Sequence, residues 1–190
     1  MYPFILIEKD AEPMELMQAI STRRSVRAFE NRPVALEDIN AAIAAAQLAP
    51  SWKNTQTAGF IVVHTPEMME KLKDALPSYN ARIVSTAGAV VVMTARRGRC
   101  GYERDGSYTT RKEDRWEMFD NGLACQNLLL SAWERGLASC VMGIYDEEKL
   151  PALLDVAEDQ YVTAVVALGY PAETPNMPKR KPLEEKVRYV

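Results

Sequence analysis

An uninterrupted apolar run, Ala87–Thr94, constrains the fold of this 190-residue chain more than any other feature. Its residues do not alternate between apolar and polar, as they would in a strand with one face in water. The run therefore predicts a strand that is covered on both faces. Such a strand needs a packed layer on each side, which favours a layered arrangement of helices and sheet.

The rest of the sequence supplies elements for these layers. Apolar spacing predicts a helix from Met14 through Ile20, with Pro13 as its starter, and a second helix from Leu36 to Ala49. Shorter helices are expected over 66–76 and 147–155, and strands over 59–63, over 161–168 and near Val141. This mixed order of elements is typical of an α+β fold or a layered α/β sandwich.

The boundaries of the chain's parts follow from the same pattern. No internal repeat or interdomain linker interrupts it, so we expect one domain over residues 1–190. Residues 1–12 form an N-terminal extension in this interpretation. Residues 96–112 form a long polar loop, and 170–190, which contain four prolines, form an extended C-terminal tail.

A single long helix is predicted over Asp114–Gly136, with Gly136 as its end. Apolar residues at helical spacing form a stripe that consists of Trp116, Phe119, Leu123, Leu130, Trp133 and Leu137. Further apolar residues widen it beyond one face, namely Met118, Cys125, Leu128 and Leu129. A helix this apolar must be buried on several sides, so we expect it in a large core or in a subunit interface.

Charge and metal-binding residues exclude several classes of protein. The formal net charge is −3, which gives no basis for nucleic-acid binding. The three cysteines form no CxxC pair and His64 is the only histidine, so we expect no metal site. No segment approaches the roughly 20 apolar residues of a membrane span, and the N-terminus lacks a signal peptide's features. A cytoplasmic protein without a membrane partner is expected.

The three cysteines are expected to have no role in chemistry. Cys100 lies among arginines in the 96–112 loop, where an exposed thiol would have a lowered pKa. We nevertheless expect an incidental thiol at this position. Cys125 and Cys140 are expected to be small core residues.

Three clusters of polar residues are candidates for a ligand site. Arg23, Arg24, Ser25 and Arg27 follow the first helix, and guanidinium groups offer planar donors that suit phosphate oxygens. The 50–56 loop gathers a hydroxyl, an ammonium group and amides, and the 179–181 segment adds positive charge to the tail. Taken singly, each cluster has a simpler interpretation as a helix end, a polar turn or a charged tail.

The order of these clusters resembles the FMN-dependent nitroreductase family. Arg23-Arg24-Ser25-Val26-Arg27-Ala28-Phe29 is similar to its basic-basic-Ser-x-basic-x-Phe motif, and Pro50-Ser51-Trp52-Lys53-Asn54-Thr55-Gln56 to its Pro-Ser-x-x-Asn-x-Gln loop. The resemblance continues through Gly136-Leu137 and Met142-Gly143 to the basic residues before Pro182, and covers about residues 14–188. It implies an α+β fold built as a three-layer α/β/α sandwich, with a mixed, mainly antiparallel sheet flanked by helices.

The resemblance also implies roles for individual residues. Arg23 is expected to bind the FMN phosphate, and Arg27 to place positive charge at the pyrimidine edge of the flavin. The 50–54 loop is expected to come from the second subunit of a homodimer. The implied cofactor-binding residues are Arg23, Arg24, Ser25, Arg27, Pro50, Ser51, Trp52, Asn54, Asn80, Val141, Met142, Gly143, Lys179 and Lys181, with Arg180 as a replacement for either lysine if the register differs.

The implied activity is reduction of a nitro compound or a related small electrophile by NADH or NADPH through FMN, in a ping-pong sequence. No catalytic side chain is required, and Arg27 would stabilise the negative charge of the reduced flavin. Three alternatives stay open: a flavin enzyme for enones, halogenated substrates or flavin fragmentation, a non-catalytic FMN-binding protein, and a domain without a cofactor. Trp52 and Met142 depart from residues common in the family, which leaves the acceptor undecided, and Tyr102 and Tyr108 either shape its pocket or pack within the loop.

Overall fold

The computed structural model describes residues 14–190, so Pro13 and the predicted extension 1–12 lie outside the described residues. The helices are α1 (Leu16–Thr22), α2 (Leu36–Gln47), α3 (Pro66–Lys73), α4 (Ser78–Val84), α5 (Arg115–Glu134) and α6 (Lys149–Leu153), with short 3-10 turns η1 (Trp52–Asn54) and η2 (Leu183–Glu185). The strands are β1 (Ala58–Val63), β2 (Ala89–Arg96), β3 (Ala138–Met142) and β4 (Gln160–Gly169). None of the described helices is both long and apolar enough to span a bilayer.

The four strands form one sheet in the order β1-β2-β4-β3, and every ladder between them is antiparallel. The predicted apolar run becomes β2, a central strand in which all residues are buried except the last. The predicted strand near Val141 becomes β3, which lies at the edge of the sheet. Both predictions are therefore confirmed.

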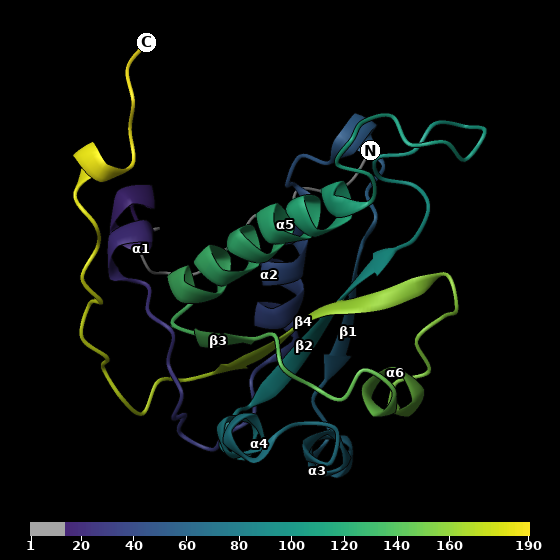
Figure 1. The fold of residues 1–190 in the computed structure, drawn as a ribbon. Coiled ribbons are helices and arrows are strands. Elements are labelled where there is room, and N and C mark those ends of the chain that lie inside the picture. The colour runs from purple at the N-terminus through teal and green to yellow at the C-terminus, as the bar shows by residue number, and fades with distance from the viewer. Residues whose placement is uncertain (1–13) are drawn as a thin grey trace.

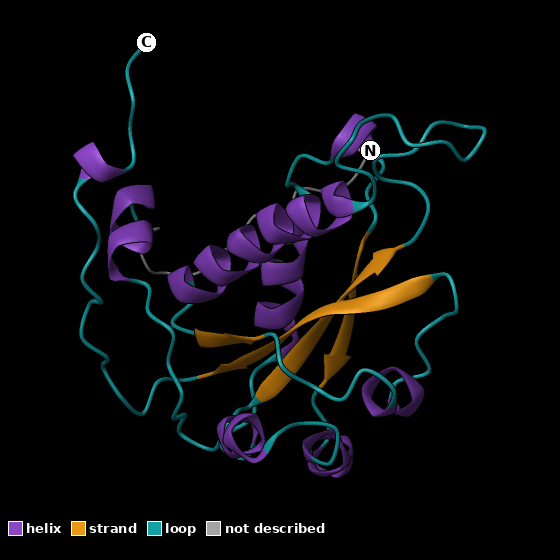
Figure 2. Cartoon of the chain, in the orientation of Figure 1, coloured by secondary structure: helices purple, strands orange, loops and turns teal. Residues whose placement is uncertain are grey.

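Helices cover both faces of this sheet, as Figure 1 shows. Val90 and Val92 of β2 pack into a core with α3, α4 and α6, whereas Val91 and Met93 pack into a second core with α2 and α5. Alternate residues of one strand thus serve opposite faces, because side chains in a strand point to opposite sides in turn. The order helix, sheet, helix (Figure 2) confirms the three-layer α+β sandwich.

The long helix is confirmed, but the N-terminal part of its predicted apolar stripe faces away from the sheet, whereas Leu137 at the other end is buried in the core. The residues that α5 buries are Glu117, Asp120, Asn121, Ala124, Leu128, Leu129 and Ala132. In contrast, Met118 and Phe119 are 51% and 57% exposed. The first turns of α5 therefore direct polar groups inward and apolar groups outward, the reverse of a helix that packs only against its own chain.

Two other features differ from the prediction. A separate helix, α4, follows Pro77, where the sequence pattern gave no helix. Cys100 is completely buried, and burial raises the pKa of its thiol to about 12, so the lowered pKa considered for an exposed thiol does not apply. The predicted end of the long helix is confirmed, since Gly136 follows α5 with a φ of 77°, whereas the helices predicted over 66–76 and 147–155 are shorter, at Pro66–Lys73 and Lys149–Leu153.

Candidate functional site

The arginine segment that follows α1 is held between the sheet edge and the tail. The Val26 N–H donates to the Ser139 carbonyl of β3 at 3.0 Å, and Ser25 forms a parallel bridge with Ser139. On the other side, the Ala172 N–H donates to the Ala28 carbonyl at 3.0 Å. The segment from Arg23 to Arg27 is thus fixed in place by backbone bonds, and its basic side chains remain on the surface or half-buried.

Positive charge collects around Arg23. Burial lowers the pKa of its guanidinium, and the charges of Arg24 and Arg180 lower it further. The tail, which runs beside α1 in Figure 1, therefore brings Arg180 toward the N-terminal cluster. A half-buried guanidinium that two neighbouring arginines repel is a group that an anion would stabilise.

Of the two lysines predicted as phosphate ligands, neither is shown to approach this cluster. Lys181 Nζ lies 3.5 Å from Glu185 Oε2 within η2 and its flank, and Arg180 Nη1 donates to the Pro178 carbonyl at 2.9 Å. The electrostatic effect on Arg23 comes from Arg180, the residue that sequence reasoning kept as a replacement for either lysine. The tail is exposed throughout 176–190, so Lys179 also faces solvent.

The end of β3 lies next to the same cluster. Arg27 acts electrostatically on Cys140 of β3, and the Arg27 N–H donates to Glu173 Oε1 at 2.6 Å. Val141 is 44% exposed at this edge, whereas Met142 is buried. Glu173, which sequence reasoning missed, is an acidic neighbour that tempers the positive charge of the site.

Asn80 joins this end of the site through α4. Its side-chain amide is buried and donates from Nδ2 to the Ile144 carbonyl at 2.8 Å. The bond fixes the segment that follows Gly143, so at least part of the role of Asn80 is to hold backbone. Arg23, Arg24, Ser25, Arg27, Asn80 and the 141–143 segment are therefore assembled on one edge of the molecule.

The 50–56 loop has an unusual backbone. Lys53, Asn54 and Gln56 have φ values of 45°, 56° and 50°, in the left-handed region that favours glycine. Each such residue costs about 1–3 kcal/mol and persists only where its surroundings fix the chain. Backbone bonds within the loop, such as that from the Asn54 N–H to the Ser51 carbonyl at 3.0 Å, account for part of this fixation.

Contacts with α5 account for the rest. The Trp52 N–H donates to Asp120 Oδ2 at 2.7 Å, and the Trp52 and Trp116 rings lie 4.7 Å apart between centroids. Trp52 Nε1 is buried and has no hydrogen-bond partner among the described residues. A buried indole N–H usually has a hydrogen-bond partner, and an ordered water molecule commonly supplies one.

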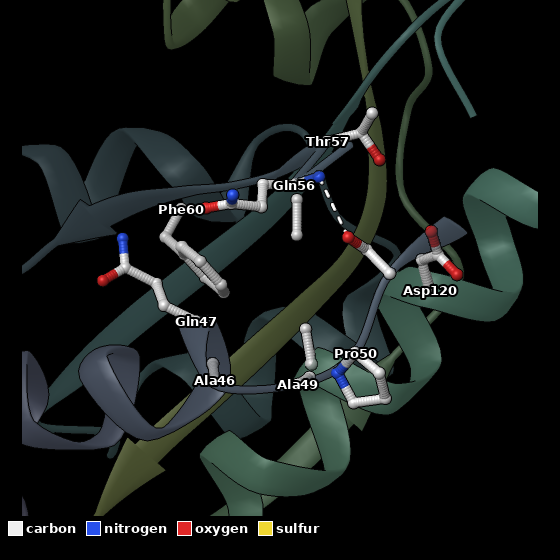
Figure 3. A pocket seen from close by; sticks show the side chains of 11 residues that line it. Ala46, Gln47, Ala49, Pro50, Gln56, Thr57, Phe60 and Asp120 are labelled. Atoms are coloured by element: carbon white, nitrogen blue, oxygen red, sulfur yellow. Dashed lines mark hydrogen bonds between the residues drawn. The ribbon is translucent and has the colours of Figure 1, made fainter. Parts of the chain in front are cut away.

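A small cavity lies behind the loop, between it, the end of α2 and α5 (Figure 3). Its volume is about 90 Å³, and its wall includes Pro50, Ser51, Gln56 and Asp120. Ser51 Oγ, at the rim, accepts the Gln56 N–H at 3.0 Å. A space of this size holds a few water molecules, since each occupies roughly 30 Å³ in the liquid, and is too small for a flavin ring.

The two groups of predicted residues lie at opposite ends of α5 (Figure 1). The 50–56 loop binds Asp120 near the start of the helix, whereas Trp133 near its end donates to Thr22 at the close of α1. The 13 helical steps from Asp120 to Trp133 correspond to roughly 20 Å of helix. One chain therefore does not bring all the predicted site residues together.

The 96–112 loop packs against the 50–56 loop. Lys53 Nζ forms an ion pair with Glu103 at 3.1 Å, and the buried Cys100 thiol donates to Asp120 Oδ2 at 3.0 Å. Tyr102 and Tyr108 pair with each other, with their ring centroids 4.8 Å apart. This contact confirms one of the two predicted roles, packing within the loop. The other role, shaping the acceptor pocket, stays a prediction, because the loop lies beside Trp52.

Asp120 is the main residue that sequence reasoning missed. The available signal was a run of polar residues, Glu117, Asp120 and Asn121, on one face of an otherwise apolar helix.

A larger cavity of about 360 Å³, lined by Arg97, Tyr145, Tyr161 and neighbouring residues of 147–162, contains none of the predicted site residues. Among the residues described, no group of acidic, histidine or cysteine side chains could hold a metal ion.

The sequence of this chain is similar to those of several known proteins. The model of the "Nitroreductase family" matches residues 20–78 and 75–170. A protein of Archaeoglobus fulgidus, provisionally named an NADH dehydrogenase/NAD(P)H nitroreductase, is 34% identical over 163 residues, covering 84% of this chain and 87% of its own. An iodotyrosine deiodinase of Haliscomenobacter hydrossis is 27% identical over 202 residues, covering 93% and 86%.

Solved structures share the fold. A protein of Exiguobacterium sibiricum, provisionally named a nitroreductase and crystallised in complex with FMN, superposes with a TM-score of 0.79 at 18% identity, covering 95% of this chain and 99% of its own. The match of the family model extends over most of the chain, from α1 to the end of β4. The chain belongs to the nitroreductase family.

Proposed function

We propose that this protein is an FMN-dependent oxidoreductase that uses NADH or NADPH to reduce a nitro compound or a related small electrophile. The observation that carries the proposal is the cluster of Arg23, Arg24 and Arg180, three like charges gathered beside the edge strand. Membership of the family and the FMN complex of a protein with the same fold support it.

The residues present suit FMN at its phosphate end. Guanidinium groups bind phosphate oxygens through paired N–H donors, and the cluster supplies three of them. Binding a dianion would relieve the repulsion that lowers the pKa of Arg23. Ser25, held against Ser139 of β3, adds a hydroxyl to the donors at this edge.

The ring end would lie nearer to Arg27, Asn80 and the 141–143 segment. When bound, FMN supplies the two-electron chemistry that links NAD(P)H to the acceptor. The Arg27 guanidinium, exposed and bonded to the Ser25 carbonyl at 3.2 Å, would stabilise negative charge on the pyrimidine edge. Asn80 would maintain the backbone that follows Gly143.

A homodimer would complete the site, with the 50–54 loop of one subunit facing the arginine cluster of the other. Two observations support this arrangement: the roughly 20 Å of α5 between the two groups, and the apolar outer face of α5. Leu16 and Met17 of α1 are also 65% and 69% exposed. Apolar surface of this extent is typical of subunit interfaces.

The test is the visible absorbance spectrum of the purified protein, before and after anaerobic addition of NADH or NADPH. Flavin bands that bleach with either reductant are expected. Flavin bands that persist would instead favour a non-catalytic FMN-binding protein. Protein without flavin, even after incubation with FMN, would refute the proposal.

A second candidate activity is reductive dehalogenation, which the similarity to an iodotyrosine deiodinase favours. It uses the same cofactor site, so the visible spectrum does not separate the two activities. Turnover with matched nitroaromatic and iodophenol acceptors does. Faster turnover of the iodophenol, with release of iodide, would make dehalogenation the assigned activity.

A further inference from the structure

Asp120 connects the two loops that meet at the start of α5. Its carboxylate is buried, and one oxygen, Oδ2, accepts both the Trp52 N–H at 2.7 Å and the Cys100 thiol at 3.0 Å. The first donor belongs to the 50–56 loop and the second to the 96–112 loop. A displacement of this single oxygen would therefore alter both loops together.

The 50–56 loop depends on such a connection because its backbone is strained. Lys53, Asn54 and Gln56 all adopt positive φ values, and the residues on both sides of this stretch must hold it in place. The Gln56 N–H is held by Ser51 Oγ, which lies inside the same loop. The Trp52 N–H, in contrast, is held by a residue outside the loop, and the bond lies one residue before the first strained position.

Glu117 is a second buried carboxylate on α5 and can be compared with Asp120. It is buried one turn earlier on the same helix, and its Oε1 accepts the Gly98 N–H at 3.0 Å. It therefore holds the start of the 96–112 loop, and no described bond joins it to the 50–56 loop. Two buried carboxylates of one helix thus differ in whether they contact the loop assigned to the flavin.

We infer that Asp120 is a positioning residue for FMN, which holds the strained 50–56 loop in its flavin-contacting conformation through the Trp52 amide. The inference rests on the proposed function, because it assigns that loop to the flavin. Position matters here more than charge, since a correctly placed oxygen of any kind can accept the Trp52 N–H. Through Cys100, the same oxygen links the variable loop to the flavin loop.

The experiment compares FMN dissociation constants, measured by flavin fluorescence in the full-length protein, for four variants. Asp120→Ala removes the acceptor of both bonds and is expected to raise the Kd at least about tenfold, because the strained loop loses the bond that holds its Trp52 N–H. Asp120→Asn keeps an oxygen in place and is expected to stay within about threefold of the wild type. Asp120→Glu keeps the charge but moves the oxygen, and is expected to weaken binding at least about tenfold.

Glu117→Ala is the matched control, because it removes a buried carboxylate from the same helix. It is expected to lower the melting temperature as Asp120→Ala does, yet to leave the FMN Kd within about threefold. A near-UV circular dichroism spectrum of each flavin-free variant reports on the Trp52–Trp116 pair. The signal is expected to change in Asp120→Ala and Asp120→Glu and to persist in Asp120→Asn.

The outcomes separate this inference from the proposed function. If the wild type does not bind FMN, both are refuted. If it binds FMN and Asp120→Ala binds equally well, or Glu117→Ala weakens binding as much, only the positioning role is overturned. If Asp120→Ala fails to fold, the comparison of Asn with Glu decides: tight binding by Asp120→Glu and weak binding by Asp120→Asn would show that charge acts instead of position.

Discussion

Replacement of Arg23 by alanine tests the anion site most directly. A charge-assisted hydrogen bond to phosphate contributes about 1.5–3 kcal/mol. The repulsion of Arg23 with Arg24 and Arg180 is present both with and without FMN, so it largely cancels from the binding free energy. The loss of about 1.5–3 kcal/mol corresponds to a roughly 10- to 150-fold increase in the FMN Kd.

The same reasoning predicts that the flavin-free protein hardly changes in stability. Relief of repulsion and loss of the side chain's packing act in opposite directions, so we expect a nearly unchanged melting temperature without FMN. Flavin fluorescence titration gives the Kd, and thermal denaturation of the apoprotein gives the stability. Arg96→Ala is the control, because that arginine pairs with Asp159 at the end of β2 and lies outside the cluster. An unchanged FMN Kd in Arg23→Ala would remove Arg23 from the site and refute the reasoning.

Three further predictions concern the tail, the helix face and the buried thiol. Arg180→Ala is expected to weaken FMN binding several-fold more than Lys179→Ala, and fluorescence titration that ranks them in reverse would restore the lysine assignment. Gly122→Leu places a side chain where the single chain has open space, and leucine favours a helix over glycine, so helix α5 should be more stable. If the partner subunit packs on this face, the same side chain should dissociate the dimer in analytical sedimentation. A dimer that persists would place the interface elsewhere. Burial raises the Cys100 pKa from 9.0 to about 12, so its contribution to folding is complete below pH 9 and is lost as the pH rises toward 12. Cys100→Ser should therefore lose less thermal stability between pH 8 and about pH 10.5 than the wild type, and equal losses would contradict this assignment.

The sequence predicts the strands well where burial is symmetric. In β2, packing on both faces makes the first five residues, 89–93, all apolar, and such a run has few other interpretations. Helix α4 was missed because it has seven residues, and its buried positions include a polar one, Asn80. A short helix of this kind is stabilised by its contacts with the rest of the protein, which the local pattern does not contain.

The face of α5 could not be predicted for a different reason. The apolar stripe predicted burial in a large core or in a subunit interface and left the choice open, and in the structure Phe119 is exposed while Asp120 is buried. An amphipathic pattern identifies which side of a helix avoids water, and does not tell whether the protecting surface belongs to the same chain.

Among the site residues, the arginine segment was found because its residues are contiguous. The approach of Arg180 depends on the path of the tail, which follows from tertiary structure alone.

The outward apolar face of α5 also has a consequence for how this protein responds to dilution. In the proposed homodimer, a second subunit covers Met118 and Phe119. Dimer formation depends on protein concentration, so the fraction of chains in which these residues are covered falls as the protein is diluted. At a fixed, saturating concentration of free FMN, the thermal midpoint would then decline as the protein is diluted, whereas that of a self-contained chain would stay constant. The amount of enzyme in a cell would thereby set the fraction that is loaded with cofactor.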